Sequence, residues 1–366
     1  MKSLVYAIVS LFLFTLFSCK NTINDEIREI DINKFPFNLN LDVTDMEILN
    51  IPSLGITEIK VVDSLLIVSV IGNNEFWNVY TIPNKDSIGS LLNVGNGPYE
   101  LSMPIPCYQS SFYKNENGDI LTSLPMPDKQ RMMEINLTEY LKDNKYENNC
   151  SQFDVKSDDM TIWTYCIDRN RYLQAYVHPE TRQIIRSIRN ISDKSDNKID
   201  NKILESLNAK SIENLDNIQL MLTTPAIRPD GNKVAEIPGF SNLVTVYNTT
   251  GDGGIKIRYK NMSDSEPEIR QLTNQNISLF GGGYGYNDYF ALIRNEIDND
   301  RIVNQHIDFI SWDGEPLGSI NLGMNTIRRF DINETYGTLF CLNSETDKII
   351  EYDISSLLNK IKTHIQ

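Results

Sequence analysis

The chain has 366 residues, with 34 Lys or Arg against 49 Asp or Glu, so its formal net charge at pH 7 is −15. This acidity argues against a nucleic-acid partner, because a phosphate backbone is bound by a basic surface, and against attachment to an anionic membrane by charge. The hydrophobic content of 40% is enough to build a core. The excess of acids is expected to serve solubility, and it would also suit a cationic ligand.

The first residues have the pattern of a bacterial export signal. Lys2 precedes an apolar run over residues 4–17, which would form a helix of about 21 Å, too short for a bilayer core of about 30 Å. Such a run is typical of a signal peptide. The residues that end it, LFS at 16–18 followed by Cys19, resemble the lipobox of bacterial lipoproteins.

This resemblance implies that residues 1–18 are a lipoprotein signal peptide and that Cys19 is the lipidated N-terminus, bearing diacylglycerol and acyl chains such as palmitate. Residues 19–30 would be a polar tether. The protein would then be held in a membrane of the bacterial cell envelope, which we expect to be the outer membrane, through its lipid. The alternative is an ordinary secreted protein in which Cys19 has no such role.

Four further cysteines follow, and an envelope compartment permits disulfides between them. Four cysteines allow three pairings, and the sequence does not choose among these. Cys150 and Cys166 are the least distant candidates, whereas Cys166 and Cys341 lie in strand-like runs and are expected to be buried. No CxxC pair is present, so a zinc site is not predicted.

Most of the remaining sequence consists of short apolar runs rich in β-branched and aromatic residues. Such runs are typical of β-strands, and the Asn-Gly and Asp-Gly pairs between them are typical of turns. Clear examples are residues 59–62, 65–70, 77–82, 289–293, 307–312 and 338–342. The pattern predicts an all-β fold, which could be a sandwich, a barrel or a propeller.

Internal repetition favours the propeller. RMMEINLTEYLK at residues 131–142 aligns with KIIEYDISSLLNK at 348–360. Both read as a strand followed by a short helix, with Thr138 or Ser355 as the expected N-cap. A second pair is GSLLNVGN at residues 89–96 and GSINLGMN at residues 318–325.

At about 45 residues per blade, the folded region predicts six blades. A strand from residues 27–50 would complete the last blade and remove an open edge. The predicted propeller covers residues 31–355, and residues 356–366 would be a C-terminal helical tail. Residues 191–216 form a polar insertion that is either a lid or a tolerated surface loop. The blades are placed at 55–100, 101–146, 147–190, 217–262, 275–323 and 324–355.

One loop adds a family resemblance. Gly95, Gly97, Pro98 and Glu100 match a Gly-x-Gly-Pro-x-Glu loop found between blades in the six-bladed, TolB-like or NHL-like propeller lipoproteins of Bacteroidetes, most of which have no assigned activity. The glycines permit positive φ and Pro98 restrains the chain after them, so a tight crossing between blades is expected. Glu100 is expected to accept hydrogen bonds from loop amides.

Residues 280–289 combine four glycines with three tyrosines. We expect a flexible aromatic loop in which Tyr284, Tyr286 and Tyr289 contact a protein, peptide or glycan ligand on one face of the ring. The alternative is that these tyrosines pack against the blade.

Residues for catalysis are not evident, and we predict no catalytic residue, metal ligand or cofactor. The three histidines, His178, His306 and His364, are scattered, and no GxSxG motif occurs. Residues 298–300 (DND) resemble a calcium loop but do not complete one.

The leading interpretation is therefore a non-enzymatic binding propeller. Two alternatives stay open: a propeller hydrolase or lactonase with a carboxylate-bound channel metal, and a structural subunit of an envelope complex. A cluster of carboxylates on the ring axis would favour the hydrolase, and a plugged axis would count against it.

Overall fold

The structure is a computed structural model of the full chain. It describes residues 27–41, 46–51, 55–155, 160–180, 184–191, 222–250, 253–262, 266–324 and 326–366. The predicted signal peptide, Cys19, and all but the first residue of the predicted insertion lie outside these ranges.

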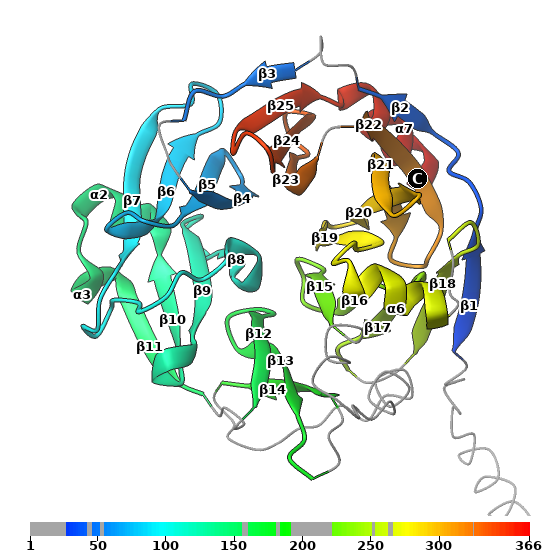
Figure 1. The fold of residues 1–366 in the computed structure, drawn as a ribbon. Coiled ribbons are helices and arrows are strands. Elements are labelled where there is room, and N and C mark those ends of the chain that lie inside the picture. The colour runs from blue at the N-terminus through cyan, green and yellow to red at the C-terminus, as the bar shows by residue number, and fades with distance from the viewer. Residues whose placement is uncertain are drawn as a thin grey trace, which may run out of the picture.

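Six β-sheets surround a central axis, as Figure 1 shows, so the predicted six-bladed propeller is confirmed. In each blade the strands run antiparallel from the axis outward. The first blade consists of β4 (Ile56–Val62), β5 (Leu65–Val70), β6 (Glu75–Thr81) and β7 (Ser87–Asn93). The second consists of β8 (Ser111–Lys114), β9 (Ile120–Met126), β10 (Arg131–Asn136) and β11 (Cys150–Asp154). The third contains β12 (Thr161–Cys166), β13 (Arg171–Val177) and β14 (Ile184–Asn190).

The N-terminal segment adds one strand to each of the remaining blades. The fourth contains β15 (Thr223–Ile227), β16 (Lys233–Pro238), β17 (Leu243–Asn248) and β18 (Gly254–Tyr259). The fifth contains β19 (Phe280–Gly285), β20 (Tyr289–Asp298), β21 (Arg301–Ser311) and β22 (Pro316–Gly323). The sixth contains β23 (Ile327–Asn333), β24 (Thr338–Asn343) and β25 (Ile349–Asp353).

The N-terminal segment forms a strap along the outer rim of three successive blades. β1 (Arg28–Ile32) pairs in parallel with β18, β2 (Asn38–Asn40) pairs in parallel with β22, and β3 (Met46–Ile48) pairs antiparallel with β25. The predicted closure of the last blade by an N-terminal strand is thus confirmed. The two parallel additions were not predicted, and Figure 1 shows the three strands following one another around the rim.

The internal repeats mark equivalent positions in different blades. β10 and β25 are both third strands, and each leads into a helix, α2 (Leu137–Asp143) or α7 (Ser355–Ile365). The expected hydroxyl caps are wrong. Asn136 caps α2 by accepting from the Glu139 amide, and the Asp353 carboxylate accepts from the Ser355 amide.

The core lies between blades, because each sheet packs a face against its neighbour on either side. Strands such as β9 and β24 are therefore buried along their whole length. Leu357, Leu358 and Ile361 of α7 belong to the cluster that joins the fifth and sixth blades, so the predicted tail is packed on the ring. No disulfide joins Cys107, Cys150, Cys166 and Cys341, and Cys166 and Cys341 are buried as predicted.

The blade boundaries differ from the prediction at two places. β11 is the outer strand of the second blade, so the third blade begins at Thr161 rather than at residue 147. The second blade begins at Ser111 rather than residue 101, because the chain after β7 forms an irregular crossing that ends in a 3-10 turn, η2 (Cys107–Gln109). Other short elements are η3 (Pro127–Lys129), α3 (Tyr146–Asn149) and α6 (Glu266–Asn274). Across the described ranges, no helix combines the length and apolarity that a membrane span needs.

Candidate functional site

A pocket of about 290 Å³ opens on the ring axis at the end where the innermost strands finish. All six blades contribute to it, through β4, β8, β12, β15, β19 and β23. Ligand sites in propellers and other rings form where such loops converge, and this volume is near the lower limit for a small-molecule site.

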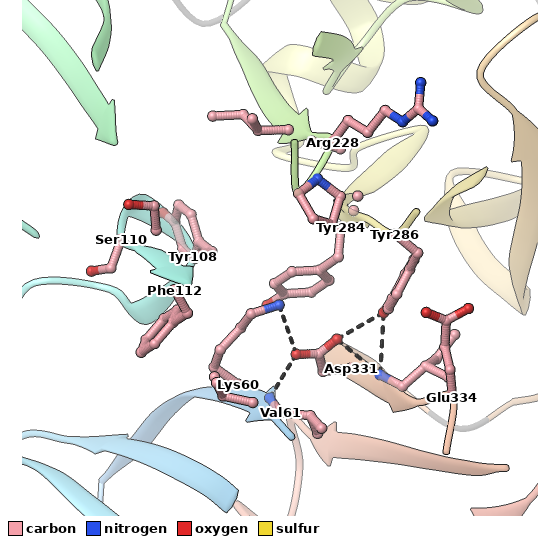
Figure 2. Close-up of a pocket in the computed structure, with 18 of the residues that line it drawn as sticks. Lys60, Val61, Tyr108, Ser110, Phe112, Arg228, Tyr284, Tyr286, Asp331 and Glu334 are labelled. Carbon is pink, nitrogen blue, oxygen red and sulfur yellow. Dashed lines mark hydrogen bonds and ion pairs between the residues drawn. The ribbon is translucent and has the colours of Figure 1, made fainter. Parts of the chain in front are cut away.

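Asp331 is the centre of the polar wall of this pocket (Figure 2). Its buried carboxylate accepts from the Val61 amide at 2.7 Å and lies 3.0 Å from the Lys60 ammonium. Its other oxygen accepts from the Tyr286 hydroxyl at 2.7 Å and from the Ile332 amide at 2.9 Å. Four donors on one carboxylate hold the side chain in a fixed position.

The Lys60 ammonium is held between this carboxylate and an aromatic face. It lies 4.9 Å from the centroid of the Tyr284 ring, which suits a cation–π contact. Burial, and after it the charge of Glu58, raises the pKa of the Tyr284 hydroxyl well above its ordinary value, so the phenol stays neutral.

The opposite wall carries hydroxyls and rings from the second blade. Figure 2 shows Ser110, Tyr108 and Phe112 across the pocket from Lys60 and Asp331. The hydroxyls of Ser110 and Ser111 are buried and have no hydrogen-bond partner among the described residues. These two hydroxyls are therefore available to form hydrogen bonds with a group that the described residues do not supply.

A plug of paired side chains forms the floor. The Arg329 guanidinium donates to the Glu58 carboxylate at 2.6 Å and lies over the Tyr108 ring, 5.3 Å from its centroid. Tyr108 and Tyr284 also border a smaller cavity of about 10 Å³ on the far side, so this layer separates the two spaces. Burial raises the pKa of Glu58 to about 7, against the opposing effect of Arg329.

The glycine-rich segment is a strand, so the prediction of a flexible loop there is wrong. Residues 280–285 form β19, the innermost strand of the fifth blade. Its glycines allow close packing: a Cβ on Gly283 would lie 2.2 Å from the Ala291 carbonyl oxygen, and one on Gly285 would lie 2.0 Å from the Ile227 carbonyl oxygen.

The three predicted tyrosines separate into two groups. Tyr284 and Tyr286 line the axial pocket, although each residue is only 6% exposed. Tyr289 is 1% exposed and packs against Tyr286 and Phe309, away from the pocket. Truncating Tyr284 or Tyr286 to Ala would therefore test core packing as much as ligand binding.

The Gly95 to Glu100 loop lies between the first two blades and does not line the axial pocket. The Gly97 amide donates to the Glu100 carboxylate at 2.7 Å, as predicted, and the Lys129 ammonium donates to the carbonyls of Gly97 and Glu100. A Cβ on Gly95 would lie 2.1 Å from the same carboxylate. These contacts fit a tight crossing between blades.

The histidines do not converge. His178 accepts from the Glu180 amide, His364 packs against Phe37, and His306 lies 2.9 Å from Glu296 in the fifth blade. In the residues that the structure describes, no three His, Cys, Asp or Glu side chains are grouped as they would be around a metal ion.

Sequence reasoning missed the charged residues of the site. Glu58 and Lys60 lie two residues apart on β4, and Arg329 and Asp331 lie two residues apart on β23. Side chains two residues apart in a strand point to the same face, so both members of each pair point to the axis. The available signal was a pair of charges of opposite sign, two residues apart, in the first strand of two different blades.

Comparison with protein-family models finds no match, and comparison with curated proteins finds no relative. Comparison with solved structures finds 462 matching chains. One is a DUF4221 family member from Bacteroides vulgatus, with TM-score 0.52 and 8% identity over 85% of this chain and 98% of that one. The Cps50 (Swd1) β-propeller domain of Myceliophteria thermophila gives TM-score 0.40 at 7% identity, over 84% of this chain and 99% of that one.

A chain of a mitotic checkpoint complex also gives TM-score 0.40, at 8% identity over 80% of this chain and 74% of that one. The Bacteroides structure shows a shared fold. The resemblance to Bacteroidetes propellers expected from the sequence therefore holds at the level of the fold.

Proposed function

We propose that this protein is a lipid-anchored component of a bacterial envelope whose axial pocket binds a small hydroxylated ligand of the carbohydrate class, without chemical conversion. The observation that carries the proposal is the pair of Ser110 and Ser111 hydroxyls, which have no partner among the described residues and line the same pocket as Lys60 and Asp331.

The chemistry of the walls matches such a ligand. A sugar presents hydroxyls that both donate and accept, and apolar ring faces that pack on aromatic side chains. The pocket offers the serine hydroxyls with the rings of Tyr108 and Phe112 on one side, and the Lys60 ammonium with the Tyr284 ring on the other. Its small volume fits a single sugar unit or the end of a longer glycan.

The same geometry does not favour a hydrolase. Asp331, which lines the pocket, and Glu58, which lies beneath it, each face a cation, at 3.0 Å and 2.6 Å. Asp331 has in addition three uncharged donors, and Glu58 lies in the plug beneath the pocket rather than at its surface. Neither carboxylate is free to act as a general base on a bound ligand.

The lipid anchor would place this pocket near a membrane. β1 begins at Arg28 on the same side of the ring as the axial opening, because β1 runs parallel to β18 and β18 runs away from that side. Residues 19–27 can span at most about 30 Å when fully extended.

Ligand binding is tested by saturation-transfer NMR on the purified protein with glucose, galactose and N-acetylglucosamine. We expect at least one of them to bind, and the Ser110→Ala, Ser111→Ala double variant to bind it about tenfold more weakly, since two hydrogen bonds are lost. Ser187→Ala is the matched control, because Ser187 is also buried without a partner among the described residues but lies on β14 outside the pocket. Absence of binding by all three sugars would contradict the proposal.

The anchor is tested separately with Cys19→Ala. This variant should leave the membrane fraction or accumulate as the uncleaved precursor. A processed Ala variant that stays in the membrane fraction would show that Cys19 is not the anchor.

A further inference from the structure

A second pocket, of about 740 Å³, lies between the fourth and fifth blades and shares no lining residue with the axial pocket. Its walls are the strap between β1 and β2, the helix α6 and the hairpin of β20 and β21. Figure 1 shows α6 beside β18 at this boundary. The Gln271 side chain of α6 donates to both carboxylate oxygens of Asp300 at 2.9 Å, which ties the helix to the hairpin.

A buried ion pair lies beside the inner end of this pocket. The Arg294 guanidinium donates to the Asp308 carboxylate at 2.6 Å, and the Ser319 hydroxyl donates to the same carboxylate at 2.6 Å. Asp308 is fully buried, so Arg294 is neutralised by a charge that solvent does not reach.

Tyr259 also lines this pocket, close to the Arg294–Asp308 ion pair. The residue is 4% exposed, and its hydroxyl makes no hydrogen bond of normal geometry to any part of the chain that the structure describes. Burial, with a further contribution from the nearby Asp308 charge, raises the pKa of Tyr259 well above its ordinary value, so the group is a neutral phenol. The ring is held by Phe35 and Phe280, at 6.4 Å and 5.2 Å between centroids.

The rim of the pocket is acidic. Glu268, Glu296 and Asp300 line it, against the cations Lys34 and Arg294, and Arg294 is already paired with Asp308. Three carboxylates and two cations therefore line the pocket, and one of the two cations is neutralised by Asp308 behind it. Burial lowers the pKa of His306, which leaves the imidazole neutral near pH 7 and adds no compensating positive charge.

The lining also has an apolar part, beside the polar side chains of Asn33, Asn38, Asn261, Asn295 and Asn299. The apolar side chains are those of Ile32, Phe35, Met262, Leu272, Leu279 and Ile297. A ligand that fills this space must therefore bury an apolar body while placing a hydrogen-bonding, positively charged end against the acids and the Tyr259 hydroxyl.

We propose that the pocket between the fourth and fifth blades binds a basic amphiphile, namely a guanidinium or ammonium group on an apolar body, as a peptide with a basic side chain presents it. The site is independent of the axial pocket. An anionic amphiphile drawn to Lys34 and Arg294 is the competing occupant, and the test distinguishes the two.

The test is calorimetric titration of the purified protein with N-acetyl-leucyl-argininamide and with its uncharged analogue N-acetyl-leucyl-citrullinamide. We expect saturable binding of the arginine probe and at least tenfold weaker binding of the citrulline probe. Spermidine, which is cationic without an apolar side chain, should bind more weakly than the arginine probe. N-acetyl-leucyl-glutamate should not bind.

Two variants connect the binding to this pocket. Glu296→Gln should weaken binding of the arginine probe about tenfold. Tyr259→Phe should weaken it several-fold and leave the protein folded, because the hydroxyl makes no hydrogen bond of normal geometry to the described residues. The Ser110→Ala, Ser111→Ala variant of the axial pocket should bind the probe normally. Equal binding of the arginine and citrulline probes, tighter binding of the glutamate probe, or full binding by both variants would overturn the proposal.

Discussion

The Arg329 guanidinium donates to the Glu58 carboxylate at 2.6 Å and so joins the innermost strands of the last and first blades. Two residues further along the same two strands, the charges are exchanged. Here the cation, Lys60, comes from the first blade and lies 3.0 Å from the carboxylate of Asp331 in the last. The ring is thus closed twice, by this pair of crossed ion pairs at the axis and by β3 on β25 at the rim.

Removing one member of the inner pair should destabilise the fold. In Arg329→Met, the Glu58 carboxylate stays buried without its cation, and we expect the free energy of unfolding to fall by about 3 kcal/mol, the lower end for a broken buried pair because the Arg329 side chain is 32% exposed. Urea unfolding gives this value. The double variant Glu58→Leu, Arg329→Met should recover most of the loss, and a double variant no more stable than the single one would contradict this account.

Glu58 also predicts a pH dependence. Its pKa is raised from 4.5 to about 7, so between these values the folded state holds a proton that the unfolded state releases. Stability from this group is fully present below pH 4.5 and is lost as the pH rises through 7, by at most about 3 kcal/mol. Urea unfolding at pH 5 and pH 8 measures the difference, and in Glu58→Gln the part due to this group should vanish. If the variant keeps the full difference, another group is responsible.

The fold could be predicted because its signals are local. Strand runs, turn pairs and the repeats at β10 and β25 depend on residues close together in the chain, and they were enough for six blades and for the closure by an N-terminal strand. The parallel pairing of β1 with β18 and of β2 with β22 was not predictable in the same way, because in the sequence pattern only the last blade lacked a fourth strand, whereas β18 and β22 already complete four antiparallel strands.

The axial site depends on contacts between residues far apart in the chain. Lys60 and Asp331 meet because the ring closes, and no local pattern connects them. The tyrosines at 284 and 286 were identified, but for the wrong reason: glycines beside aromatic residues were interpreted as a mobile loop. In the structure, Gly283 and Gly285 make room for a neighbouring backbone in a buried strand.

That interpretation of the glycines can be tested directly. A Cβ on Gly285 would meet the Ile227 carbonyl of the adjacent blade at 2.0 Å, and backbone cannot move aside as a side chain can. We expect Gly285→Ala to lower the free energy of unfolding by about 2 kcal/mol or more. Gly239→Ala is the control, since a Cβ there has no neighbour within 4 Å. Equal melting temperatures of the two variants would mean that the blades separate easily at this point.

The strap is expected to protect the ring from association. β1, β2 and β3 cover the outer edges of β18, β22 and β25, and exposed edge strands are sites where chains pair with one another. A variant lacking residues 27–48 should therefore form oligomers or aggregates, which size-exclusion chromatography with light scattering detects. Glu29→Gln is the control, because Glu29 is exposed and β1 pairs through its backbone. A deletion variant that remains monomeric and as stable as the intact chain would show that the strap is dispensable for the ring.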